Sequence, residues 1–387
     1  MNANSDTSAG WLVVGHYGGH NGGDEAMLAG LLSAAALQRP GTPSIVRKID
    51  RCCRLVRVRA LENGKTVPPK LWPILRALSS ARGIVLGGGT HFQDDYTTLR
   101  WLRHVRYMAR FVLLSGVARL LGRRVVWLGM GFGPIHRRTT ALLTALGLRF
   151  CDAVAVRDAS SAAAIRPLVA KQKLTTAFDL AALLAPFPKS GRPAGGAPLL
   201  GISVTSVGKS RGLGEDLDRA FWDRFGRVLG EVVAAGRARV RIIVMRGGAR
   251  EDDGAVSEQL FAALWRSSPD SVELVPFPHD PLELIRQISE CDAFIATRFH
   301  SLLLAYLAGC RLLAIEYHKK VRDLAEEIGL PSDACIPVAW DASEERLRTG
   351  VDRLLHDEQW GHPSLPVSEA VRRANRNLDL LTEVAGR

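Results

Sequence analysis

Short apolar runs alternate with helical segments along almost the whole of this 387-residue chain. Ten of these runs are the expected strands, and they lie at 11–15, 44–49, 83–88, 124–129, 153–156, 199–204, 240–245, 271–277, 293–297 and 311–315. Regular alternation of strands and helices is typical of βαβ units, in which a parallel sheet is covered by helices on both faces. The sequence therefore predicts an α/β fold.

A Pro- and Gly-rich stretch, "APFPKSGRPAGGAP", interrupts this alternation at 185–198. Because the chain is too long for one ordinary core, we expect two Rossmann-like domains that are joined there. The expected division is a first domain over 1–185, a linker over 186–198, a second domain over 199–365 and a C-terminal helix over 366–387 that could pack back on the first domain.

Composition excludes several classes of protein. Apolar residues make up 47 % of the chain, which indicates a packed core rather than a disordered chain. The polar start "MNANSDTSAG" lacks the pattern of a signal peptide, and no apolar run reaches the roughly 18–20 residues that span a bilayer. Six scattered cysteines form no CxxC pair, so neither a disulfide framework nor a zinc site is expected. We expect a cytoplasmic protein without a metal or another cofactor.

The two halves of the chain differ in charge. Residues 1–190 hold 26 Lys and Arg against 10 Asp and Glu, a net charge of +16, and the remainder holds 25 against 29, a net charge of −4. A basic first half points to an anionic partner, such as a membrane surface, a nucleic acid or a phosphorylated substrate, unless it serves solubility alone. Because the basic half lacks interleaved aromatic residues, no nucleic-acid partner is expected.

The segment 98–124 is expected to form a basic amphipathic helix. Its apolar side would carry Trp101, Val105, Met108 and Val112. Its basic side, nearly opposite, would carry Arg100, Arg103, Arg106 and Arg110. One interpretation is a core helix whose polar side is solvated. The other is a helix whose arginines contact an anionic membrane, so that the protein is peripheral on the inner face.

Groups of polar residues follow the ends of the expected strands, which is the edge where open α/β sheets bind ligands. "HYGGHNGGDE" follows the first strand, "GTHFQDD" the third and "MGFGP" the fourth. These turns match no phosphate-loop pattern, and Asp24 and Glu25 would repel a phosphate. Carboxylates and amides bind sugar hydroxyls well, although Asp24 could merely cap its helix.

A cationic cluster follows two strands of the second half. Arg298 and His300 straddle the start of a helix, where the helix dipole favours anions. Lys320 follows the next strand and should return to the same sheet edge. Arg157 can approach from the first domain, unless it only forms an ion pair with Asp158. The cluster predicts a site for a small, highly charged anion.

Over roughly residues 11–330 the ordered motifs resemble the polysaccharide pyruvyl transferase family. The motifs that carry this resemblance are "GGHNGGDEAML", "GGGTHFQDD", "GMGFGP", "VAVRDASS", "RFHSLLLAYLAG" and "EYHKKVRDLA". The resemblance implies two Rossmann-like domains that face each other across a cleft, as in the glycosyltransferase-B class. The sequence departs from the family pattern at His91, in "AFDL" at 177–180 and at Lys319.

The resemblance also implies phosphoenolpyruvate as the donor and a cyclic pyruvate ketal on two sugar hydroxyls as the product. We expect His300 to act as general acid, because histidine titrates near neutral pH, and Asp24 or Glu25 to act as base or acceptor anchor. The remaining expected substrate-binding residues are Arg157, Arg298, Lys320, Ser301, Asn21, Gly23, Gly89, Asp94 and Gly131.

The acceptor that the family implies is a saccharide, expected to be lipid-linked, and the pathway is cell-surface or exopolysaccharide biosynthesis. The leading alternative is a nucleotide-sugar-dependent glycosyltransferase of the same fold. That alternative predicts an acidic residue for a ribose, or an aromatic residue for a base, near "RFHS", and neither is evident in the sequence.

Overall fold

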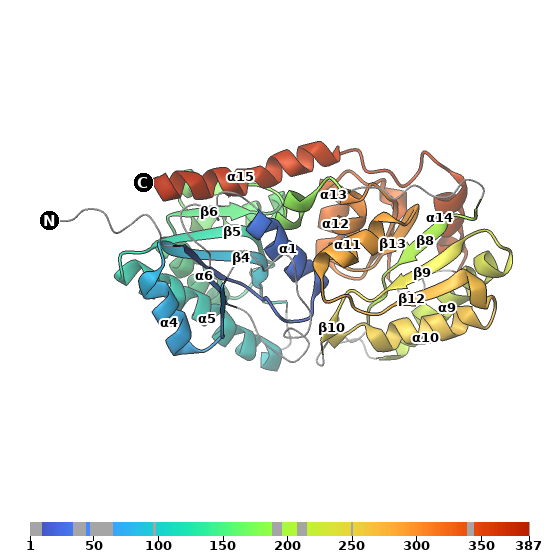
Figure 1. Ribbon diagram of the computed structural model, residues 1–387, viewed down its shortest axis with the longest axis horizontal. Helices are drawn as coiled ribbons and strands as arrows, with labels where there is room; N and C mark the ends of the chain where they lie inside the picture. The colour runs from blue at the N-terminus through green and yellow to red at the C-terminus, as the bar shows by residue number, and fades with distance from the viewer. Residues whose placement is uncertain are drawn as a thin grey trace. The chain divides into compact units, whose positions relative to one another are not determined.

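The computed structural model describes residues 10–33, 44–46, 65–95, 98–187, 196–206, 215–248, 251–338 and 344–386. The chain divides into two compact units (Figure 1). The first unit contains Met1–Gly19, Asp24–Leu184 and Ser368–Arg387, and the second contains His20–Gly23 and Ala185–Val367. Each unit is built on its own parallel sheet, so the predicted α/β class with two Rossmann-like units is confirmed.

The sheet of the first unit has seven strands in the order β3-β2-β1-β4-β5-β6-β7, all paired in parallel. Its strands are β1 (Trp11–Val14), β2 (Ser44–Val46), β3 (Lys65–Val67), β4 (Gly83–Phe92), β5 (Arg124–Phe132), β6 (Ala153–Val156) and β7 (Leu174–Thr176). The central strands β1, β4, β5 and β6 are almost wholly buried, which explains why they read as continuous apolar runs in the sequence.

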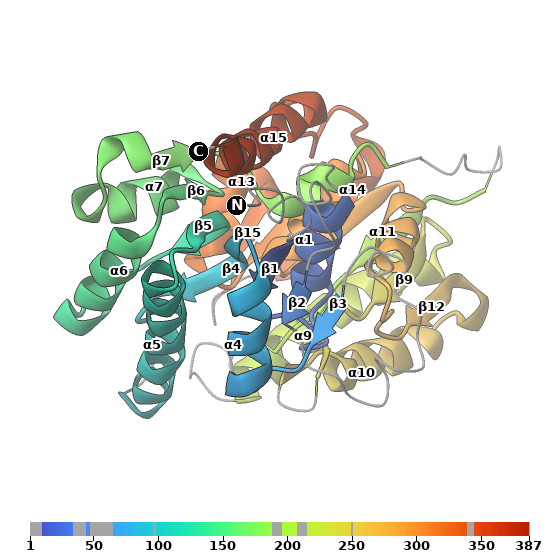
Figure 2. The same cartoon turned by 60° about the vertical axis from the view of Figure 1, so that its left-hand side comes forward.

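Helices cover both faces of this first sheet. They are α1 (Gly22–Ser33), α4 (Leu71–Ser80), α5 (Thr98–Leu120), α6 (Arg138–Phe150), α7 (Ala159–Ile165) and α15 (Val367–Gly386), with the short 3₁₀ helices η2 (Arg166–Leu168), η3 (Lys171–Lys173) and η4 (Leu180–Leu184). Right-handed crossovers that step from β3 to β4, β5 and β6 place α4, α5 and α6 on one face, where Figure 2 shows them side by side.

The C-terminal helix α15 packs on the first unit through Asn377, which is fully buried. The Asn377 Oδ1 accepts a hydrogen bond from the Gly129 backbone N at 2.9 Å, and its Nδ2 donates to the Phe178 carbonyl at 3.1 Å. Arg376 also donates to the Thr176 carbonyl at 3.0 Å. The end of the chain is therefore tied to strand β5 and to the segment that follows β7.

The second unit has a six-stranded parallel sheet in the order β12-β9-β8-β13-β14-β15. Its strands are β8 (Leu199–Ile202), β9 (Arg239–Ile243), β12 (Val272–Val275), β13 (Ala293–Ala296), β14 (Arg311–Glu316) and β15 (Cys335–Pro337), and a short antiparallel pair is formed by β10 (Gly247–Gly248) and β11 (Glu251–Asp252). Its helices are α9 (Glu215–Ala234), α10 (Gly254–Trp265), α11 (Pro281–Ser289), α12 (Phe299–Leu307), α13 (Lys319–Glu327) and α14 (Glu344–His356), with the 3₁₀ helices η5 (Pro269–Ser271) and η6 (Ser332–Ala334).

The structure changes some of the expected boundaries. Strands β4 and β5 continue through the glycines that were expected to end them, with a register shift between Thr90 and Phe92. The edge strands β3, β7 and β15 are only three residues long, and their sequences carry no apolar run that would predict them. Of the expected strand 44–49, residues 47–49 lie outside the described residues. Among the described helices, none is long and apolar enough to cross a membrane.

Candidate active site

In the second unit, His300 packs on the backbone of a segment that lies far from it in sequence. The segment 20–23 joins this unit through two backbone hydrogen bonds of 3.0 Å, from Gly22 N to Met245 O and from Gly247 N to His20 O. A Cβ atom on Gly23 would fall 2.0 Å from the Cγ and Nδ1 atoms of His300. Glycine is therefore required at position 23 for the imidazole to lie where it does. The structure thus brings together Gly23 and His300, two of the predicted site residues.

Arg298 immediately precedes helix α12 and is held by a buried carboxylate. Its Nε and Nη2 atoms donate to the two carboxylate oxygens of Asp253, each at 2.6 Å. Asp253 is 1 % exposed, so this bidentate pair is largely shielded from water. The sequence interpretation missed Asp253, because it follows no apolar run. The pair neutralises Arg298 locally and fixes the direction of its guanidinium.

Ser301 supports the start of helix α12. Its hydroxyl accepts a hydrogen bond from the Arg298 backbone N at 3.0 Å and another from the Ser203 hydroxyl at 2.8 Å. The side chain is completely buried. Through these bonds Ser301 supports the start of the helix.

Two lysines open helix α13, and the structure separates their surroundings. Lys319 is exposed and forms an ion pair with Asp323 at 2.6 Å. Lys320 is half-buried, and no carboxylate in the described part of the chain pairs with its ammonium. Its backbone N donates to the Nδ1 of His318, which caps the helix, at 3.2 Å. Of the two lysines, Lys320 is therefore the one whose charge no carboxylate of the described residues neutralises.

Two further histidines lie in the second unit and were not predicted. The ring centroids of His20 and His279 are 5.5 Å apart, and both rings contact Phe277 edge-on. His279 follows strand β12 in the segment "VPFPHD", so the rule that polar residues after strand ends mark a site could have found it.

In the first unit, the glycine loop after β1 is closed by carboxylate and phenol groups. The Gly18 backbone N donates to Oε1 of Glu25 at 2.6 Å, and the Tyr17 hydroxyl donates to the Gly87 carbonyl at 2.9 Å. Burial and the neighbouring Asp24 and Glu25 carboxylates raise the pKa of Tyr17 well above its usual range. Glu25 therefore organises the loop.

Asp24 and His91 both lie close to the same glycine, Gly89. A Cβ atom on Gly89 would lie 3.6 Å from Oδ1 of Asp24 and 3.5 Å from Cε1 of His91, and the backbone there has a φ of +86°. His91 Nδ1 is hydrogen-bonded to the Tyr107 hydroxyl at 2.9 Å. Burial, followed by the nearby His16, lowers the pKa of His91 to about 3, so this imidazole is neutral.

Asp94 is buried and has a structural role. Its carboxylate accepts hydrogen bonds from the backbone N atoms of His136 and Arg137, at 2.9 and 2.6 Å. These two residues lead into helix α6, so Asp94 joins the end of β4 to the start of that helix. Asp94 therefore supports the start of α6 and not that of α5, the helix that follows it in sequence.

Arg157 follows strand β6 and is 5 % exposed. Its guanidinium contacts Asp158 at 3.3 Å and Asp179 at 3.6 Å, and it donates to the Thr90 hydroxyl at 3.0 Å. A Cβ atom on Gly131 would lie 3.0 Å from its Nε, so glycine at that position leaves room for the arginine. The ion pair with Asp158 that the sequence left open is therefore present, and Asp179 adds a second carboxylate.

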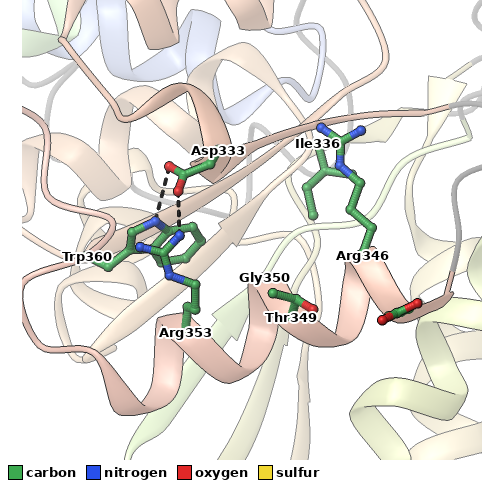
Figure 3. A pocket seen from close by; sticks show the side chains of 8 residues that line it. Asp333, Ile336, Arg346, Thr349, Gly350, Arg353 and Trp360 are labelled. Atoms are coloured by element: carbon green, nitrogen blue, oxygen red, sulfur yellow. Dashed lines mark hydrogen bonds and ion pairs between the residues drawn. The ribbon is translucent and has the colours of Figure 1, made fainter.

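A shallow pocket of 330 Å³ lies elsewhere in the second unit, between β15 and α14 (Figure 3). Its Arg353 is paired with Asp333 and stacks over the Trp360 ring, with 4.7 Å between Cζ and the ring centroid. Asp333 precedes β15, so the pocket lies at the amino end of that strand, opposite the edge that carries His300. We do not assign the active site to it.

Metal and thiol chemistry gain no support in the described residues. No group of three or more His, Cys, Asp or Glu residues there could hold a metal ion. Of the six cysteines, Cys52 and Cys53 lie outside the described residues. Burial raises the pKa of the Cys151 and Cys291 thiols, and that of Cys335 to about 11, so these thiols stay protonated at neutral pH.

Comparison with known proteins gives a family for the chain and a fold for its structure. A family model described as polysaccharide pyruvyl transferase matches residues 21–319. No curated protein matches the chain. Two similar solved structures are UDP-GlcNAc 2-epimerase from Methanocaldococcus jannaschii (TM-score 0.60, 10 % identity, 96 % of this chain and 99 % of that chain) and UDP-GlcNAc 2-epimerase from Neisseria meningitidis bound to UDP-GlcNAc (TM-score 0.61, 10 % identity, 96 % and 99 %). At such identities they show the fold alone, which confirms the predicted glycosyltransferase-B-like class.

Proposed function

Because this chain belongs to the polysaccharide pyruvyl transferase family, we propose that it transfers the pyruvyl group of phosphoenolpyruvate to two hydroxyls of a glycan sugar. The observation that carries the proposal is the placement of His300 against Gly23 at an edge that also holds Lys320 and the start of two helices. A cation and helix N-termini favour a small polyanion, and an imidazole can supply a proton.

The proposed reaction begins at the methylene carbon of phosphoenolpyruvate. His300 donates a proton to this carbon, and C2 gains oxocarbenium character. One sugar hydroxyl attacks C2 and loses its proton, and the bond from C2 to the phosphate oxygen breaks. The second hydroxyl then attacks C2, gives its proton to the released phosphate and closes the ketal ring. Lys320 and the helix N-termini would stabilise the carboxylate and the departing phosphate, since fixed positive groups stabilise developing negative charge.

The two arginines have a different part in this proposal. Arg157 and Arg298 are each paired with carboxylates, so their charge toward a ligand is reduced. We propose that they act as donor clamps, and that their carboxylate partners fix the direction of each guanidinium.

The first unit supports the acceptor side of the reaction. Asp24 is a buried carboxylate that faces Gly89 next to the neutral imidazole of His91. A carboxylate can accept a hydrogen bond from a sugar hydroxyl and can take its proton. We propose Asp24 as base or acceptor anchor, and Asn21 and Gly89 as substrate-binding residues. We assign Glu25 and Asp94 to the support of the loops.

Calorimetry in the presence of EDTA tests the donor. Because fixed cationic groups and no metal cluster are found among the described residues, phosphoenolpyruvate should bind without added divalent metal. Mass spectrometry should then show a candidate glycan that gains one pyruvyl ketal. Binding that needs Mg²⁺, or a glycan left unmodified by any acceptor extract, would contradict the proposal.

A nucleotide-sugar-dependent glycosyltransferase is the alternative, because the similar epimerase from Neisseria meningitidis is described as bound to UDP-GlcNAc on the same fold. Competition in the same calorimeter separates the two, since the alternative requires that a UDP-sugar bind and phosphoenolpyruvate not. We further propose that the enzyme works in the cytoplasm, in cell-surface or exopolysaccharide biosynthesis, on a lipid-linked acceptor at the inner membrane face.

A further inference from the structure

The outer side of helices α4, α5 and α6 exposes large apolar side chains. Of the ten large apolar residues that are exposed in the described part of the chain, eight lie between Leu71 and Leu146. Trp72 is 79 % exposed, Leu120 88 % and Leu142 71 %. Single exposed leucines are ordinary, but a group on one layer of helices marks an interaction surface. The apolar members of this surface, here called the α4–α6 face, are Leu71, Trp72, Leu113, Leu120, Leu142 and Leu146.

The same surface is basic. Residues 96–151 hold ten arginines and no Asp or Glu. The basic members of the α4–α6 face, all exposed, are Arg76, Arg100, Arg103, Arg106, Arg110 and Arg149. In the part of the chain that the structure describes, none of these six pairs with a carboxylate. Their charges are therefore not neutralised by the protein itself.

Helix α5 shows how the two kinds of side chain combine. Positions 103, 106, 110, 113 and 120 follow one another along one side of a helix, because their spacings are three, four or seven residues. The first three are arginines and the last two are leucines. The opposite side of α5 lies in the core, where Met108 and Val112 are buried. The exposed side is thus basic in its first half and apolar in its second.

Several arginines of the second unit have a carboxylate partner, and four such pairs are Arg286–Glu283, Arg322–Glu316, Arg348–Glu231 and Arg353–Asp333. Three exposed arginines there, Arg219, Arg239 and Arg266, have no carboxylate partner among the described residues, but they belong to separate elements. The α4–α6 face differs because its six unpaired arginines lie on three neighbouring helices that also expose large apolar side chains.

We propose that the α4–α6 face docks on an anionic lipid bilayer, with its arginines at the headgroup phosphates and Trp72, Leu120 and Leu142 in the interfacial region. A bilayer surface can bind both kinds of side chain, since its phosphates attract arginines and its interfacial region takes up apolar groups. A second copy of the chain would bring two basic faces together, and a nucleic acid would leave the leucines in water. The inference rests on the proposed function in one respect only: docking would bring the enzyme to a lipid-linked acceptor.

The docking differs from the purely electrostatic attachment that the sequence of α5 predicts, because apolar side chains also enter the interface. Trp101 has no part in it, since Arg137 lies over its ring at 4.4 Å from the ring centroid. We therefore expect binding to depend on anionic lipid at low salt and to weaken, without vanishing, at about 0.5 M salt, where the Debye length is only a few ångströms.

Co-sedimentation of the full chain with phosphatidylcholine vesicles, with and without phosphatidylserine, tests the proposal. Changing Arg100, Arg103, Arg106 and Arg110 together to Gln should weaken binding to the anionic vesicles by at least 100-fold, at about fivefold per arginine. Changing Trp72, Leu120 and Leu142 together to Ser should abolish the binding that remains at high salt. Brominated lipid should quench tryptophan fluorescence in the wild type and less in Trp72→Phe.

Matched controls are available in the second unit. Arg286, Arg322, Arg348 and Arg353 changed together to Gln give the same change in charge, and Trp265→Ser removes another exposed tryptophan; both variants should bind vesicles like the wild type. No binding to anionic vesicles, an equal loss in the controls, a shift of DNA instead, or a dimer dissociated by the serine variant would overturn the proposal. Phosphoenolpyruvate binding, measured on every variant, should stay unchanged, so failure of docking and failure of the proposed function are distinguishable.

Discussion

The carboxyl edges of the two sheets carry opposite chemistry. At the edge of the first unit, Asp24 and Glu25 are buried carboxylates and the imidazole of His91 is held neutral. At the edge of the second unit, Lys320 and the start of α12 and α13 supply positive charge at the same carboxyl edge as His300, because strands β13 and β14 are neighbours. The first set suits neutral groups that donate hydrogen bonds, such as sugar hydroxyls, and the second suits an anion.

Under the proposed function, one fold would be used twice for different ligands. Both units place polar residues after buried parallel strands, as open α/β sheets generally do. Both also hold one arginine against carboxylates, Arg157 in the first unit and Arg298 in the second. The groups that differ between the two edges are therefore a carboxylate in one unit and a lysine with an imidazole in the other, and under the proposed function these groups select the ligand of each edge.

The strongest test of this comparison removes the proposed acid of the second unit. His300→Ala should lower kcat by about 10²–10⁴-fold, because general acid catalysis is typically worth that much. Phosphoenolpyruvate should still bind, since Lys320 is untouched, and circular dichroism should show an intact fold. His362→Ala, which removes an exposed histidine of the same unit, is the matched control and should leave kcat unchanged. A folded His300→Ala enzyme that keeps more than about a tenth of its activity would refute the role.

Much of the fold followed from the sequence, because buried parallel strands read as continuous apolar runs. The runs at 11–15, 153–156 and 293–297 correspond to β1, β6 and β13 within a residue or two. The strands β3 and β15 were missed, since a strand at the edge of a sheet buries little and needs no apolar run. The ends of β4 and β5 were misplaced because their glycines continue the strands.

The candidate site was predictable in part, for a related reason. Residues that directly follow a strand, such as Arg157 and His300, can be located from the pattern alone. Their partners cannot, because the pairs of Arg298 with Asp253 and of Arg157 with Asp179 join residues that are far apart in sequence. The pattern also gave no sign that residues 20–23 pack within the second unit.

A second prediction uses the contact between Gly23 and His300. Gly23→Ala should lower kcat, because a Cβ atom at 2.0 Å from the imidazole must displace it, and should lower the free energy of unfolding by about 1–3 kcal/mol, which is the usual cost of overpacking. Helix propensity alone would favour the alanine, since Gly23 lies in α1. Turnover and the melting temperature are the measurements.

Gly230→Ala is the matched control for this substitution. Gly230 also lies in a helix, α9, but the nearest atom to its added Cβ would be the Ser267 hydroxyl at 3.8 Å. This variant should keep its turnover and gain up to about 1 kcal/mol of stability. If Gly23→Ala behaves like Gly230→Ala, His300 does not depend on the segment 20–23.

The smallest expected effect concerns the first unit and its neutral histidine. The pKa of His91 is about 3 in the folded protein and near the ordinary value of 6.5 in the unfolded chain. Between these two values the unfolded chain binds a proton that the folded protein does not, so stability should fall as the pH falls from 6.5 toward 3. The slope from this one group is at most about 1.4 kcal/mol per pH unit.

His91→Phe tests this prediction, because the phenyl ring can stack on Phe111, whose ring centroid lies 4.7 Å from that of the imidazole, but it cannot titrate. Urea unfolding at several pH values from 5 to 7 should therefore show a shallower loss of stability in His91→Phe than in the wild type, whereas His362→Ala should follow the wild type. Equal slopes in His91→Phe and the wild type would mean that His91 takes up its proton in the folded state, and the contrast between a neutral first edge and a cationic second edge would then be lost.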